Sequence, residues 1–174
     1  MAQTKATQPP NMTESGEALA ALLLSQRVMF DAVDRRLRTQ LGLSFPLFEA
    51  LFVLSVAPQG RLRMVDIQRR MLVSKSNVTQ LVDKLEAQGF VEREASPTDR
   101  RLVYAILTER GPEAVAQGLE IFNAVASESF TQFLSKDELE KITSGLSKVI
   151  TEWAPGMPSR EARAAHRSLP YAKP

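Results

Sequence analysis

The chain has 174 residues and a mass of 19.3 kDa, which fits one domain with tails and can bury a core without disulfides or structural metals. It is 44% hydrophobic and 24% charged, and 22 Lys and Arg nearly balance 20 Asp and Glu, for a formal net charge of +2. The absence of cysteine excludes disulfides, zinc–thiolate sites and thiol nucleophiles.

Three further features narrow the function. The single histidine, His166, lies in a segment with Pro and Arg, which argues against a histidine metal site or a catalytic triad. No GxxxxGK[ST] or GxGxxG nucleotide motif occurs. The longest apolar run, Ala18 to Leu24, is seven residues and too short to span a bilayer, and Met1 to Asn11 has no apolar signal region. We therefore expect a cytoplasmic protein that is not an enzyme, binds no metal or cofactor and does not associate with a membrane.

The first predicted element is a long helix. Residues 1–12 are polar and contain a Pro pair, which is typical of a flexible arm. From Thr13, apolar residues recur about every 3.6 positions, which predicts an amphipathic helix that Gly42 ends. Residues 18–24 are apolar over more of the helix circumference than one small domain could cover, so residues 13–43 are predicted to be a dimerisation helix.

Two further helices are predicted before residue 73. Ser44 is expected to cap the first of them, with Pro46 in its first turn and Pro58 and Gly60 after its end. Residues 61–72 combine a short extended start with a short helix.

The next helix carries a polar face. Ser74 is expected to cap it, and Gly89 ends it in the left-handed position common after helices. Its inward positions are aliphatic and follow the i, i+3, i+4, i+7 rule. Its outward positions are all polar: Lys75, Ser76, Thr79, Gln80 and Asp83.

A hairpin and two more helices complete the predicted elements. Residues 91–95 and 102–107 are strand-like and flank SPTDRR, a basic turn, which predicts a hairpin wing. Thr108 is expected to cap a helix that reaches residue 130 or 133, and the sequence from Ser135 to Glu138 is a capping box for a last helix. We expect residues 108–153 to form C-terminal dimerisation helices and residues 154–174 to form a flexible basic tail.

The order of these elements predicts a mainly α protein with a small β wing. Residues 44–107 describe a winged helix-turn-helix domain, flanked by N- and C-terminal dimerisation helices. The major groove admits one helix and is read by hydrogen-bond donors and acceptors, which the helix from Ser74 offers. Residues 61–101 contain nine Lys and Arg against six Asp and Glu, a local net charge of +3, which favours contact with phosphate. The predicted partner is double-stranded DNA, and the predicted contact residues are Arg63, Ser74, Lys75, Ser76, Asn77, Thr79, Gln80, Lys84, Asp99, Arg100 and Arg101.

Three segments together resemble the MarR family of bacterial transcription regulators: LSFPLFEALFVLS, LVSKSNVTQLVDKLEAQGFVERE and SPTDRRLVYAILTERG. The most specific motif is the wing tip, where Asp99-Arg100-Arg101 fits the family's D-x-R pattern before LTERG. The resemblance implies a homodimer on a pseudo-palindromic operator, with the helix from Ser74 in the major groove. It also implies that Arg101 reaches the minor groove and that Asp99 holds it, in a regulator, expected to be a repressor, that a small aromatic anion releases.

Two alternatives remain open at this point. Arg36, Phe45 and Phe48 are candidate residues for binding such a small effector, but the aromatic residues also fit a core or a dimer interface, and Arg36 fits a solvated stripe. The winged domain could instead serve protein–protein assembly without specific DNA binding. The polar helix face and the basic wing tip favour DNA.

Overall fold

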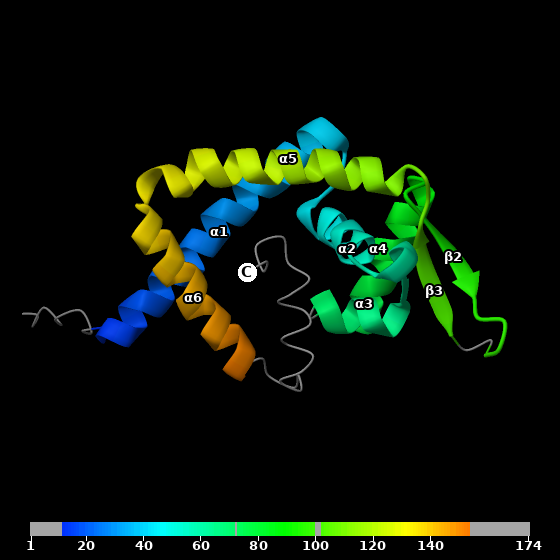
Figure 1. Cartoon of the computed structure of the whole chain (residues 1–174), viewed down its shortest axis with the longest axis horizontal. Coiled ribbons are helices and arrows are strands. Elements are labelled where there is room, and N and C mark those ends of the chain that lie inside the picture. The colour runs from blue at the N-terminus through cyan, green and yellow to red at the C-terminus, as the bar shows by residue number, and fades with distance from the viewer. Residues whose placement is uncertain (1–11, 72, 100–101, 154–174) are drawn as a thin grey trace, which may run out of the picture.

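The computed structural model describes residues 12–71, 73–99 and 102–153, and Figure 1 shows their arrangement. The chain is mainly helical with one small antiparallel sheet, so the predicted fold class is confirmed. In chain order the elements are α1 (Glu14–Leu41), α2 (Phe45–Ser55), β1 (Arg61–Arg63), α3 (Met64–Met71), α4 (Lys75–Ala87), β2 (Val91–Ala95), β3 (Val103–Leu107), α5 (Gly111–Ser129) and α6 (Lys136–Trp153), with 3-10 turns at Pro58–Gly60 and Thr131–Phe133.

Local capping chemistry fixes most helix ends where the sequence predicts them. The Thr13 side chain accepts from the N–H of Gly16 at the start of α1, and Gly42 ends that helix with a φ of 67°. Ser74 accepts from the N–H of Asn77 at 3.2 Å at the start of α4. The capping box before α6 is complete, because Ser135 and Glu138 exchange hydrogen bonds between side chain and backbone in both directions.

Two predicted side-chain caps are wrong. Ser44 stands at the N-cap of α2 without accepting a hydrogen bond there; Asp34 of α1 accepts from the N–H of Phe45 at 2.7 Å and satisfies the helix end instead. Thr108 does not cap α5, which begins at Gly111; its hydroxyl donates to the carbonyl of Gly89 at 2.8 Å. In both places a contact between elements replaces the local one.

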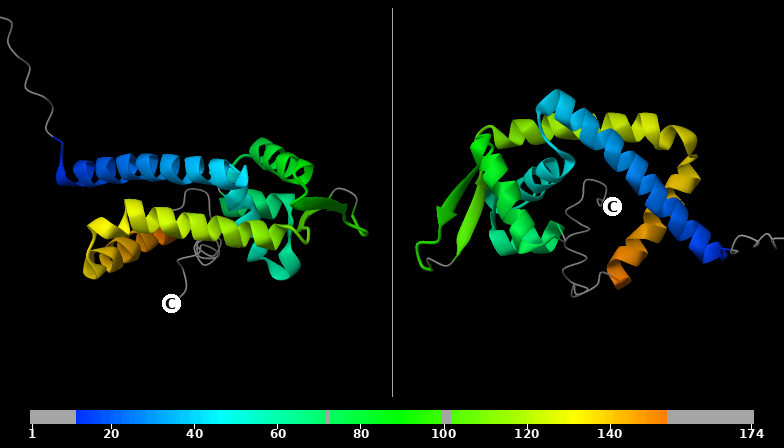
Figure 2. Two further views of the ribbon diagram at one scale, coloured as in Figure 1. Left: turned by 90° about the horizontal axis from the view of Figure 1, so that it is seen from above. Right: turned by 180° about the vertical axis from the view of Figure 1, so that it is seen from behind.

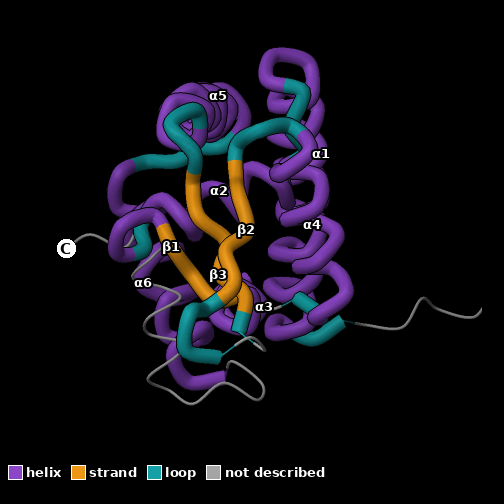
Figure 3. The backbone as a smooth tube through the Cα atoms, turned by 90° about the vertical axis from the view of Figure 1, so that its right-hand side faces the viewer, coloured by secondary structure: helices purple, strands orange, loops and turns teal. Residues whose placement is uncertain are grey.

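The sheet has the strand order β1-β3-β2, and Figure 3 shows it beside α4. Arg61 to Arg63 of β1 pair with Ile106 to Tyr104 of β3, which joins the wing to the helix-turn-helix formed by α3 and α4. Strands β2 and β3 pair over their full length, from Val91 opposite Leu107 to Ala95 opposite Val103. The wing is therefore a two-stranded ribbon beyond the short β1.

The core consists of two adjoining apolar clusters. The larger one lies within the winged domain and buries aliphatic residues of α2, α3, α4 and the sheet, among them Leu51, Ile67 and Val82. The smaller one joins α1, α2 and α5, where Phe48 is 3% exposed. Gly118 of α5 makes this second cluster possible, because a Cβ there would lie 2.3 Å from Cε2 of Phe48.

Helices α1, α5 and α6 extend to one side of the winged domain, opposite the wing (Figures 1 and 2). Residues 21–28 of α1 are all exposed, including Leu24 at 64% and Val28 at 68%, and α6 makes only sparse contact with the other described elements. Within the described ranges no single helix is long and apolar enough to cross a membrane; α1 and α2 meet that test only as a pair bent by 80°.

Candidate nucleic-acid interface

Helix α4 presents a polar surface beginning at its first turn. Val78, Val82 and Leu85 are buried against the winged domain, which turns the opposite side of the helix to solvent. The predicted contact residues of α4 and its cap lie exposed there: Ser74, Lys75, Ser76, Asn77, Thr79, Gln80 and Lys84. The first turn carries no acidic residue, so the positive end of the helix dipole is not offset there.

The cations near this surface differ in how they are paired. The side chains of Lys75 and Lys84 have no acidic partner within the described part of the chain. Arg63, at the end of β1, donates Nε and Nη2 to the Asp66 carboxylate at 2.5 and 3.0 Å, and this pairing raises the pKa of the Arg63 guanidinium. Of the three, Lys75 and Lys84 are therefore free to meet a phosphate, whereas Arg63 would have to share its charge.

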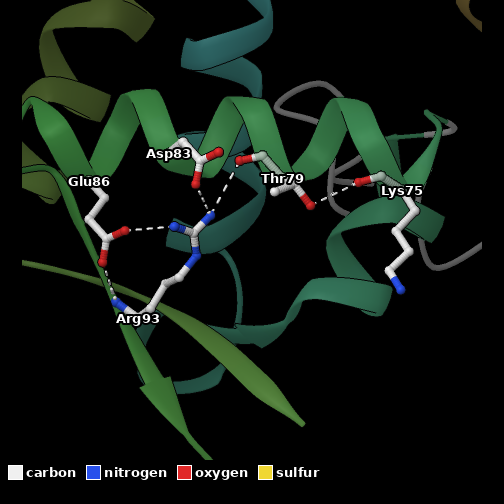
Figure 4. Close-up of polar contacts among 5 residues, drawn as sticks. All are labelled: Lys75, Thr79, Asp83, Glu86 and Arg93. Atoms are coloured by element: carbon white, nitrogen blue, oxygen red, sulfur yellow. Dashed lines mark hydrogen bonds and ion pairs between the residues drawn. The ribbon is translucent and has the colours of Figure 1, made fainter. Parts of the chain in front are cut away.

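Arg93 of β2 is a prominent feature of this face that the sequence prediction missed. Its guanidinium forms ion pairs with Asp83 at 2.6 Å and Glu86 at 2.7 Å, both on α4 (Figure 4). The strand alternation could have revealed it, because residues two apart in a strand face the same side and Val91 is buried. Arg93 lies on the same side of β2 as the buried Val91, and an arginine on that inward side needs an acidic partner.

The described part of the wing turn is held by a serine. The hydroxyl of Ser96 accepts from the N–H groups of Thr98 and Asp99, both at 3.4 Å, and the carbonyl of Asp99 accepts from the N–H of Leu102 at 2.9 Å. Arg100 and Arg101 lie outside the described residues, and so does the expected contact between Asp99 and Arg101.

A groove of about 590 Å³ runs between the helix-turn-helix and the wing. Its lining combines aliphatic side chains with polar residues of both elements: Arg63, Met64, Val65, Gln68, Lys75, Val78, Thr79, Asp83, Arg93, Leu102 and Val103. The helix-turn-helix and the wing thus both contribute side chains to this groove, above the apolar cluster that they share.

The three candidate effector residues lie where α1, α2 and α5 meet. Arg36 donates Nη2 to Oε2 of Glu128 at 2.7 Å, which raises the pKa of Arg36 and lowers that of Glu128. The rings of Phe45 and Phe48 have centroids 6.4 Å apart, and Phe48 belongs to the buried cluster. Of these two aromatic residues, Phe45 is partly exposed and Phe48 is buried.

Sequence comparisons place the chain among transcription regulators. A family model described as "MarR family" matches residues 41–102, the region of the winged helix-turn-helix. The chain is 35% identical over 108 residues to the uncharacterized HTH-type transcriptional regulator YfiV of Bacillus subtilis, a match that covers 62% of this chain and 66% of the relative. It is 28% identical over 129 residues to the transcriptional repressor MprA of Escherichia coli, covering 70% of this chain and 69% of MprA. The matched region thus spans about two thirds of these relatives' length.

Solved structures share the fold over most of the chain. AbsC, a MarR family transcriptional regulator from Streptomyces coelicolor, matches with a TM-score of 0.71 and 25% identity, covering 81% of this chain and 95% of AbsC. Sco3205, a MarR family regulator from the same organism solved in complex with DNA, matches with a TM-score of 0.75 and 23% identity, covering 86% of this chain and 94% of Sco3205. Sequence and fold agree with the resemblance read from the wing and helix motifs, and this chain belongs to the MarR family.

Proposed function

We propose that this chain is a homodimeric transcription regulator, acting as a repressor, that binds double-stranded DNA by sequence. The observation that carries the proposal is the face of α4, where exposed donors and acceptors from Asn77 to Gln80 stand beside the unpaired Lys75. Such side chains can read base edges in the major groove, while a lysine contacts phosphate. The wing stands beside the same helix and is suited to the adjacent minor groove.

The homodimer follows from surface that one chain leaves uncovered. The apolar positions of α6, including Leu139, Ile142 and Leu146, lie on one face and are only half-buried. With the exposed apolar side chains of α1 they form a surface that a second copy would bury. Two winged domains related by a twofold axis would then meet two half-sites of a pseudo-palindromic operator.

A small anionic effector would act at the junction of α1, α2 and α5. Arg36 supplies a cation there and Phe45 a partly exposed ring, with the buried Phe48 behind it. Because Arg36 is held by Glu128, an anion would have to replace that carboxylate, which would remove the ion pair between α1 and α5. We propose this exchange as the route by which effector binding changes the spacing of the winged domains. Arg36→Gln should abolish release of DNA by salicylate-like aromatic carboxylates, measured by fluorescence anisotropy.

The test of DNA recognition is selection from a randomised duplex library followed by gel shift. We expect one enriched, near-palindromic sequence bound well above a random duplex of the same length. Arg101→Ala should weaken binding to the enriched duplex, because a narrow minor groove attracts arginine. Equal binding of all sequences, or none, would instead favour the use of the winged domain for protein–protein assembly.

A further inference from the structure

The wing is tied to α4 by one residue that reaches three points along the helix. In addition to its two ion pairs, Arg93 donates Nη2 to the carbonyl oxygen of Thr79 at 3.3 Å, and its backbone N–H donates to Oε1 of Glu86 at 3.2 Å (Figure 4). Thr79, Asp83 and Glu86 are spread over about two turns of α4. Contacts at both ends of that stretch fix the direction of the strand as well as its distance from the helix.

The charge of this cluster argues against a direct DNA contact. One guanidinium faces two carboxylates, so the group formed by Arg93, Asp83 and Glu86 carries a net negative charge. The Arg93 side chain is 26% exposed, and both of its terminal nitrogens are engaged with α4. A phosphate would be repelled here, in contrast to the neighbouring Lys75.

Stability alone is a poor explanation for the cluster, since partly exposed ion pairs contribute little to the free energy of unfolding. Geometry is a better one, because the planar guanidinium holds its partners in fixed directions. Near its base the wing is anchored by Thr108 on the Gly89 carbonyl and by Arg110 on the Gln88 carbonyl. Arg93 acts farther along β2, an edge strand that pairs only with β3, at the position opposite Ala105 in the middle of the sheet.

We infer that Arg93 is a positioning residue that sets the distance and angle between α4 and the wing, and does not touch DNA itself. The inference rests on the proposed function for its consequence: the two elements can meet a major groove and the next minor groove together only if their spacing matches the duplex. Loss of the brace should therefore cost binding to the correct sequence and spare charge-driven binding to any sequence.

The first experiment measures the brace without DNA. The chain has no cysteine, so spin labels can be placed at Ala87→Cys on α4 and Pro97→Cys in the wing turn, both exposed. Labelled protein is mixed with excess unlabelled protein, so that only the two labels within one chain contribute. The distribution of distances between these two labels is measured by pulsed electron paramagnetic resonance. We expect Arg93→Gln to broaden the distribution. An unchanged distribution would overturn the inference.

Arg61→Gln is the matched control. Arg61 also lies in the sheet, is similarly exposed at 30%, and forms an ion pair with Glu94 of β2 at 3.0 Å. Because residues 93 and 94 point to opposite faces of the strand, this pair does not reach α4. Its loss should leave the distance distribution narrow, and broadening as large as that of Arg93→Gln would show that any lost sheet ion pair loosens the wing.

The second experiment uses the duplex enriched by the wild-type protein and a random duplex of equal length. Arg93→Gln should lose roughly tenfold in affinity for the enriched duplex, comparable to one good base contact, with little change on the random duplex. Glu86→Gln should act in the same direction, and the double variant should be no worse than Arg93→Gln alone. Arg93→Lys should recover part of the loss, since an ammonium still reaches a carboxylate.

A direct phosphate contact would give a different result. Affinity for both duplexes would fall together, and the slope of log K against log salt would become shallower by about one per chain, which would overturn the inference. If the wild-type protein enriches no sequence, the proposed function fails, and the spin-label distances still decide whether Arg93 braces the wing.

Discussion

Gln80 and Lys75 are both exposed on α4, but they would meet DNA with different chemistry. The Gln80 amide offers a donor and an acceptor that can pair with a base edge, whereas the Lys75 ammonium is a point charge. Gln80→Ala should cost roughly 1–3 kcal/mol on the enriched duplex and should relax preference at the base pair it reads. Selection repeated with the variant checks this change in preference.

Lys75→Ala is the companion variant for that measurement. It should weaken the enriched and the random duplex about equally, and the salt slope should fall by about one per chain. Equal losses on both duplexes for Gln80→Ala would mean that its side chain contacts the DNA backbone rather than a base.

Glu49 of α2 carries a stability cost that depends on pH. Burial raises the pKa of its carboxyl above the ordinary value of 4.5. With a raised folded-state pKa, the folded chain binds a proton more readily than the unfolded chain, so stability falls as pH rises from 4.5 through the folded-state pKa and stays reduced above it. Glu49→Gln should therefore raise Tm at pH 7, and this gain should vanish below pH 4.5.

Thermal denaturation of both proteins from pH 4 to pH 8 tests this sign, with Glu92→Gln on the exposed wing as the control that should not change Tm. A lower Tm for Glu49→Gln at pH 7 would mean that the carboxylate is paired in the assembled protein.

Packing between α2 and α5 depends on one missing side chain. A Cβ on Gly118 would lie 2.3 Å from Phe48, whose ring is buried between these helices. Gly-to-Ala substitution inside a helix ordinarily stabilises it by about 0.5–1 kcal/mol, but here overpacking should reverse the sign and cost about 1–3 kcal/mol. Urea denaturation of Gly118→Ala measures the difference.

Gly145→Ala on α6 is the matched control, because a Cβ there meets nothing within 4 Å. It should be neutral or stabilising in the same assay. If Gly118→Ala proves stabilising, the α2–α5 contact must be loose enough for Phe48 to move aside.

The elements that local chemistry defines were predictable, and those that tertiary contacts define were not. Gly42 and Ser74 act through their own backbone and nearest turn, so the sequence alone places the ends of α1 and α4. The cap of α2 comes from Asp34, eleven residues earlier on another helix. Burial raises the pKa of the Asp34 carboxyl, but hydrogen bonds from Arg38 and the Phe45 N–H outweigh it and lower the pKa overall. No local pattern marks Asp34 for this role.

The candidate interface shows the same division. Helical periodicity separates the buried and exposed sides of α4, which was enough to list its polar residues. The contact of Arg93 with α4 depends on how β2 packs against that helix, and a count of charged residues does not reveal it. Nine cations between residues 61 and 101 suggested a basic surface, whereas Arg61, Arg63 and Arg93 are all paired with carboxylates. The charge available to DNA is therefore smaller and more localised than composition implies.

The described part of the chain exposes two kinds of surface, and they lie at opposite ends. The wing and α4 offer polar groups, while residues 21–28 of α1 and the half-buried apolar residues of α6 offer apolar ones, and Figures 1 and 2 show these helices at the end of the molecule away from the wing. An apolar surface of that extent is rarely left to water. Because α1 also carries Asp34, which caps α2, any partner that packs on α1 sets the position of the winged domain as well.

Dimerisation should therefore be separable from folding of the winged domain. Leu24 and Val28 lie one turn apart on α1, are 64% and 68% exposed, and contribute to neither apolar cluster of their own chain. Changing both to glutamate should yield a monomer in sedimentation velocity at micromolar concentration, since a second chain could not bury the two charges. The wild-type Tm should rise with protein concentration and that of the double variant should not.

Gln40→Glu adds a charge to an exposed site on the same helix, beyond the apolar segment, and should remain dimeric. The monomeric variant should keep the circular dichroism of the winged domain, because the contacts of α2, α3 and α4 do not involve residues 24 and 28. Its affinity for a palindromic duplex should fall to that for a single half-site, since one winged domain no longer fixes the second beside its target. If the Leu24→Glu/Val28→Glu protein remained dimeric, the dimer interface would lie elsewhere than on α1. If it were monomeric but bound the palindromic duplex as tightly as wild type, binding would not require two half-sites.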